Sequence, residues 1–119
     1  MTEPLTNSID RATFTELQET TGAEFTAELV GTFLDEAPQL LEQLTAALRA
    51  GQADAFRRTA HSLKTNALTF GALTLAAQAR ELEQRSIDSV TAETANPLDA
   101  LAQEYARVAV ALKALSHVA

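Results

Sequence analysis

The chain has 119 residues, a formal net charge of −7 and 46% hydrophobic residues, and it contains no cysteine. This length suits one domain, residues 1–119, and the scarcity of glycine, proline and aromatic residues favours an all-α fold. The acidic charge argues against binding to nucleic acid or to an anionic membrane, the lack of cysteine excludes disulfides and thiol chemistry, and the lack of a long apolar run or a signal-peptide pattern predicts a cytoplasmic protein.

The first half of the chain predicts a loose arm and two helices. The arm covers residues 1–9. Asp10 is a suitable N-cap for a short helix over residues 12–20. A long helix is expected over residues 23–50, because apolar residues recur there at helical spacing and Gly51 is a good residue to end it. Its inward stripe is predicted to consist of Phe25, Leu29, Phe33, Leu40, Leu44 and Leu48.

The second half predicts three further helices. Two of them, over residues 53–70 and 72–85, are separated by Gly71, which permits a tight turn. Residues 86–95 are expected to form a polar loop, and Asn96 is a good N-cap for a last helix that runs nearly to the C-terminus. Helices joined by short loops pack antiparallel, so we expect an up-down-up-down four-helix bundle with a short extra N-terminal helix. The predicted inward residues are Phe56, Ala60, Leu63, Ala67 and Phe70, then Leu75, Ala76, Ala79 and Leu82, then Leu98, Leu101, Tyr105, Val108, Leu112 and Leu115.

His61 lies one position past the inward stripe of the third long segment, so the core should hold its backbone while its ring reaches solvent. Arg57, four residues before it, and Lys64, three residues after it, share its helix face. Two cations beside an imidazole favour its neutral, nucleophilic form near neutral pH and attract an anion such as a phosphoryl group. Spacing alone would still allow His61 to be an ordinary surface residue.

Glu83 lies 22 positions after His61, and Gly71 is near the midpoint between them. If the two helices pair antiparallel about Gly71, Glu83 falls on the flank of its helix at the level of His61 and can reach the ring. A carboxylate that accepts from Nδ1–H would fix the tautomer and leave Nε2 as the nucleophile. An ordinary solvated charge, or an ion pair with Arg80, is the alternative for Glu83.

The residues around His61 resemble the motif of the histidine-containing phosphotransfer (HPt) domain family. Residues 60–64 (Ala-His-Ser-Leu-Lys), 70–72 (Phe-Gly-Ala) and 82–83 (Leu-Glu) follow the family pattern of Ala-His-x-Leu-Lys-Gly, then Gly-Ala, then Leu-Glu. The similarity covers about residues 25–83. It departs at Thr65, where the family usually has a glycine that leaves room for the partner's active site. Thr65 can narrow the approach, select partners, slow transfer or hydrogen-bond a phosphoryl oxygen.

The resemblance implies a relay function. His61 Nε2 would attack the phosphorus of a receiver-domain phospho-aspartate and pass the group to a second receiver, while Lys64, with Arg57, offsets the phosphoryl charge and Glu83 orients the imidazole. The chain would be a relay intermediate without an ATP site rather than an enzyme, with no cofactor or metal of its own, and the receiver would supply Mg²⁺. The implied partners are response-regulator receiver domains and a hybrid sensor histidine kinase, and the implied state is a monomer.

Two other functions stay open at this point. The dimerisation bundle of a sensor histidine kinase has an acceptor box His-Glu-x-Arg-Thr-Pro, which residues 61–66 match only partly because they lack the acidic residue and the proline. A helical bundle that only binds proteins, with His61 incidental, is kept open by Thr65. Two histidines without cysteine argue against a zinc or di-iron site, and His117 is expected to be a plain surface residue.

Overall fold

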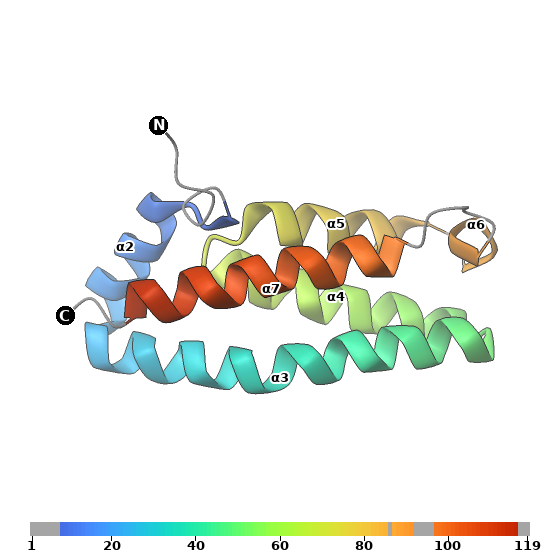
Figure 1. Ribbon diagram of the computed structural model, residues 1–119, viewed down its shortest axis with the longest axis horizontal. Coiled ribbons are helices and arrows are strands. Elements are labelled where there is room, and N and C mark those ends of the chain that lie inside the picture. The colour runs from blue at the N-terminus through green and yellow to red at the C-terminus, as the bar shows by residue number, and fades with distance from the viewer. Residues whose placement is uncertain (1–7, 86, 92–96, 117–119) are drawn as a thin grey trace.

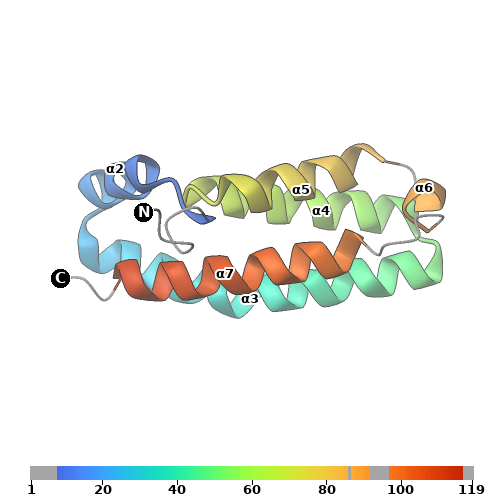
Figure 2. The same ribbon diagram turned by 45° about the horizontal axis from the view of Figure 1, so that its top comes forward.

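The computed structural model describes residues 8–85, 87–91 and 97–116, and the regular elements within these ranges are helices. The long helices α3, α4, α5 and α7 lie side by side with alternating directions, and α2 lies across one end of them (Figures 1 and 2). The predicted all-α, up-down-up-down bundle with an extra N-terminal helix is therefore confirmed. The helices are α2 (Arg11–Thr21), α3 (Ala23–Ala50), α4 (Ala53–Thr69), α5 (Leu73–Gln84), α6 (Ile87–Thr91) and α7 (Pro97–Ser116).

The start of the described chain is fastened to the α4–α5 turn. The Asp10 carboxylate accepts a hydrogen bond from Thr13 N, as predicted for an N-cap, and Asp10 N donates to Gly71 O at 2.7 Å. Residues 1–7 of the predicted loose arm lie outside the described residues. The prediction is wrong for residues 8 and 9, because Ser8 and Ile9 are buried. Burial of the Ile9 side chain against the bundle stabilises the fold, because it removes apolar surface from water.

The long helix α3 has the predicted bounds, but its buried face differs from the predicted stripe at the N-terminal end. Phe25, predicted to face inward, is 51% exposed. Thr26 and Val30 are buried in its place, and Thr26 Oγ1 donates to Gly22 O at 2.8 Å, which satisfies the hydroxyl in the core. Successive residues lie about 100° apart around a helix, so the burial of Thr26 turns Phe25 toward solvent.

Helices α4 and α5 form the most extensive helix contact of the described chain. Gly71 makes the turn between them with φ +80°, a backbone conformation in which a side chain would be strained. All the residues predicted to face inward on these helices are buried, and Ala60 and Ala79 are both at 0% exposure. Small residues at the contact let the two helices pack closely and in a fixed register.

The predicted polar loop over residues 86–95 is wrong for residues 87–91, whereas residues 86 and 92–95 lie outside the described residues. Residues 87–91 form the short helix α6, and Val90 is only 2% exposed and buried in the hydrophobic core. Helix α7 begins at Pro97 with Asp99 in its first turn, as predicted, whereas the predicted cap Asn96 lies outside the described residues. No helix in the described ranges is long and apolar enough to cross a membrane.

Candidate functional site

The hairpin of α4 and α5 brings His61 against Glu83. His61 Nδ1 lies 2.7 Å from Glu83 Oε2, so the contact expected from the sequence is present. The His61 side chain is 57% exposed, while Leu63 and Ala60 beside it in sequence are fully buried. The backbone of the histidine is thus held by a rigid core, and its ring is open to solvent.

Lys64 contacts the other oxygen of the same carboxylate. Its Nζ lies 2.8 Å from Glu83 Oε1, and the Lys64 and Glu83 side chains are only 22% and 20% exposed. The Lys64 ammonium, and after it the His61 ring, hold the pKa of the Glu83 carboxyl below its ordinary value of 4.5. Glu83 is therefore ionised at neutral pH and joins the lysine to the histidine.

The ionised carboxylate decides which histidine nitrogen carries the proton. A carboxylate without a proton can only accept hydrogen bonds, so Nδ1 of His61 must donate to Glu83 Oε2. In the neutral ring, Nε2 then keeps its lone pair. The arrangement presents a nucleophilic nitrogen toward solvent and fixes the ring that carries it.

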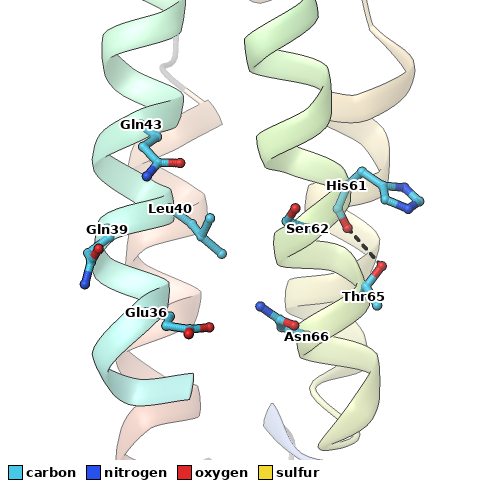
Figure 3. Close-up of a pocket in the computed structure, with 8 residues that line it drawn as sticks. All are labelled: Glu36, Gln39, Leu40, Gln43, His61, Ser62, Thr65 and Asn66. Carbon is cyan, nitrogen blue, oxygen red and sulfur yellow. Dashed lines mark hydrogen bonds between the residues drawn. The ribbon is translucent and has the colours of Figure 1, made fainter. Parts of the chain in front are cut away.

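The structure gives Arg57 and Thr65 their own partners near His61. The Arg57 guanidinium forms an exposed ion pair with Asp54 at 2.7 Å, one turn back along α4. Thr65 Oγ1 donates to the main-chain oxygen of His61 at 3.1 Å, as Figure 3 shows, and its side chain is exposed. The single hydroxyl proton of Thr65 is thus engaged within the helix, which leaves its oxygen lone pairs as acceptors.

A groove between α3 and α4 borders the site and was not predicted from the sequence. It has a volume of about 590 Å³. Figure 3 shows its two walls, with the imidazole of His61 turned away from α3. The residues that line it are Glu36, Gln39, Leu40 and Gln43 of α3 and His61, Ser62, Thr65 and Asn66 of α4. Helical spacing marks these α3 residues only as polar or half-buried, and their pairing with α4 follows from the packing.

Across residues 8–85, 87–91 and 97–116, no three histidine, aspartate or glutamate side chains gather closely enough to hold a metal ion. His117 lies outside the described residues.

Comparisons with known proteins agree with this fold. The family model of the Hpt domain matches residues 28–116. The crystal structure of histidine-containing phosphotransfer protein B (HptB) from Pseudomonas aeruginosa PAO1 is similar to this chain, with a TM-score of 0.83 and 30% sequence identity over 92% of this chain and 94% of that one. A search of curated proteins found no match.

The chain thus belongs to the Hpt domain family, the helical bundles that carry out histidine phosphotransfer in phosphorelays. Proteins of this family are relay intermediates that interact with receiver domains and kinases. The family resemblance expected from residues 60–64, 70–72 and 82–83 is confirmed.

Proposed function

We propose that His61 is the phospho-acceptor of this chain and that it relays a phosphoryl group between receiver-domain aspartates. The observation that carries the proposal is the 2.7 Å contact from Nδ1 to the Glu83 carboxylate on an otherwise exposed ring. It supports a nucleophilic Nε2 with a fixed direction of attack.

The proposed step balances without a cofactor on this chain. The Nε2 lone pair attacks phosphorus in line, the bond from phosphorus to the aspartyl oxygen breaks, and its electrons leave with the aspartate carboxylate. The ring becomes cationic as Nε2 bonds to phosphorus, and the Glu83 carboxylate beside Nδ1–H offsets that charge. Transfer to a second receiver reverses the step.

Lys64, Arg57 and Thr65 have supporting roles in the proposal. Lys64 stabilises negative charge on the phosphoryl oxygens, and its ion pair with Glu83 keeps it on the same side of the bundle as the ring. Arg57 is an auxiliary cation that must exchange its contact with Asp54 to reach an incoming phosphoryl group. Thr65 occupies the position of the usual glycine and adds bulk beside the acceptor.

The partners follow from the same chemistry. We infer that receiver domains and a hybrid sensor histidine kinase supply and remove the phosphoryl group, that the receiver holds the Mg²⁺, and that this chain has no ATP site and acts through its partner's active site. The single domain over residues 1–119, the monomeric state and the cytoplasmic location stay predictions.

The decisive experiment mixes the chain with a phosphorylated receiver domain and Mg²⁺. We expect an acid-labile, base-stable phosphate on the wild-type chain and none on His61→Gln, because glutamine offers no nucleophilic ring nitrogen. Circular dichroism establishes that both chains are folded. Binding of a receiver without any transfer to wild type would instead identify a bundle that only binds proteins.

A further inference from the structure

The groove beside the acceptor has a distinct chemistry on its two walls. Three carboxamides and two hydroxyls line it, and the half-buried Leu40 supplies an apolar surface between them. Carboxamides donate and accept hydrogen bonds, so these walls can satisfy the main chain of an arriving loop. The groove is thus suited to a polypeptide segment with mixed polarity. The carboxamides are Gln39, Gln43 and Asn66, and the hydroxyls belong to Ser62 and Thr65.

Glu36 gives this surface its charge. Among the described residues that line the groove, it is the one carboxylate, and none of them is a lysine or arginine. The Glu36 side chain is exposed, and nothing in the described ranges engages its carboxylate in an ion pair or hydrogen bond. Figure 3 shows it across the groove from Thr65 and Asn66 and directed toward α4.

The groove adjoins the phosphotransfer site but carries the opposite charge. Glu36 makes the groove negative, whereas Lys64 places a positive charge beside His61. His61 lines the groove, while its ring turns away from α3 (Figure 3) and contacts Glu83 through Nδ1. Ser62 and Thr65 are exposed groove residues one and four positions after His61, so a protein that docks over His61 on this face of α4 also covers the groove. The same partner then meets the Lys64 cation near the phosphoryl group and the Glu36 carboxylate on the α3 wall of the groove.

We propose that Glu36 is a specificity-determining residue, which selects receiver domains that place a lysine or arginine side chain in the groove between α3 and α4. This inference rests on the proposed function, because the occupant is the receiver that exchanges phosphate with His61. Charge complementarity is the reason for expecting a basic residue of the receiver in the groove. A docked receiver removes water from the Glu36 carboxylate, and a lysine or arginine of the receiver offsets the free-energy cost of that desolvation. An acidic or apolar residue of the receiver does not offset it.

The test compares charge changes at two positions of the same helix. Glu36→Lys reverses the charge in the groove, and Glu42→Lys makes the same change at an exposed α3 residue that does not line it. Receiver domains that transfer phosphate to the wild-type chain serve as probes. We expect Glu36→Lys to raise the KM for such a receiver about tenfold with little change in kcat, Glu36→Gln to raise it about threefold, and Glu42→Lys to have a smaller effect.

Two controls separate docking from the reactivity of the histidine. Phosphoramidate phosphorylates a histidine without a protein partner, since Nε2 attacks phosphorus and ammonia leaves, and we expect its rate to be the same in wild type and Glu36→Lys. Replacing receiver lysines and arginines one at a time by glutamate should yield one receiver variant that loses affinity for wild type and regains it with Glu36→Lys.

Binding measured on the His61→Gln background distinguishes failure of this inference from failure of the proposed function. If no receiver transfers phosphate to wild type, a receiver that only binds it serves as the probe, and weaker binding to Glu36→Lys would mean that the proposed function fails while the charge preference stands. Equal KM values for Glu36→Lys and Glu42→Lys would overturn the inference. A wild-type dimer that Glu36→Lys dissociates would also overturn it, because the groove would then hold a second copy of the chain.

Discussion

Glu83 Oε2 lies 2.7 Å from His61 Nδ1, although the two residues are 22 positions apart and belong to different helices. The antiparallel packing of α4 and α5 about Gly71 creates this contact, and the second carboxylate oxygen holds Lys64 at 2.8 Å. One carboxylate therefore links the direction of the imidazole to the position of a cation.

Glu83 is expected to act as a positioning residue. Glu83→Ala removes both the charge and the acceptor, and we expect phosphotransfer to slow by about 10- to 100-fold, with a smaller loss in Glu83→Gln, which keeps an acceptor oxygen. Nitrogen NMR of the ring should show the proton on Nδ1 in wild type and a mixture of tautomers in Glu83→Ala. Glu81→Ala, an exposed neighbour on α5, is the control. An unchanged tautomer with a slow rate would mean that Glu83 has another role.

The Glu83 carboxyl should titrate below 4.5, and Lys64→Ala should raise its pKa more than His61→Ala does, because the lysine is the larger cause of the shift. A folded-state pKa below the unfolded one means that Glu83 stabilises the fold above its ordinary pKa and that this contribution is lost as the pH falls through the folded value. Carboxyl carbon NMR measures the pKa, and urea unfolding across acidic pH measures the stability. A larger shift in His61→Ala would reverse the assigned order.

Lys64→Ala should slow phosphotransfer without unfolding the bundle, because the partly exposed lysine adds charge at the site and is not part of the core. Combining it with Glu83→Gln tells whether the lysine acts on the phosphoryl group or through Glu83. Rate losses that multiply indicate a direct action, whereas a double variant no slower than Glu83→Gln indicates that Lys64 only holds the carboxylate. An unchanged rate in Lys64→Ala would refute both roles.

Thr65→Gly should leave phosphotransfer equal or faster, since it removes side-chain bulk beside His61. Thr65→Ser keeps the hydroxyl that donates to His61 O, and Thr65→Val keeps the shape without the hydroxyl, so the pair separates the two properties. If bulk is the obstacle, Thr65→Val resembles wild type and Thr65→Ser is faster. A large loss in Thr65→Gly, with Thr65→Ser active, would make the hydroxyl a working part of the site. Thermal unfolding of each variant accounts for the cost of glycine within α4.

Gly71→Ala should destabilise the bundle at the turn that sets the site. Its φ is +80°, and an added Cβ would lie 2.8 Å from Asp10 O and 2.9 Å from Thr13 Cβ. We expect a loss of at least about 1–3 kcal/mol in the free energy of unfolding from the backbone strain alone. Gly31→Ala is the matched control, because that glycine is helical with open space around it and the change should stabilise by about 0.5–1 kcal/mol. Urea unfolding compares the variants, and equal stabilities would contradict the strain assigned to Gly71.

The sequence alone determined the helices that carry the site and the side of α4 on which the histidine lies. The stripes of α4 and α5 are unambiguous, because every residue that the apolar spacing places inward on them is buried. The spacing from His61 through Gly71 to Glu83 then gave the contact across the hairpin. Periodicity was less decisive at the N-terminal end of α3, where Phe25 and Thr26 compete for the inward position and a hydrogen bond to Gly22 O lets the threonine occupy it.

Only the tertiary structure decided how the remaining surfaces combine. Val90 of the short helix α6 is buried in the hydrophobic core, which its polar neighbours in the sequence do not reveal. The ion pair of Lys64 with Glu83 and the groove between α3 and α4 likewise require the helices to be placed against each other. Local sequence fixes which face of a helix is apolar, but the rotation and level at which two helices pack depend on side chains from both, and these set which polar groups meet.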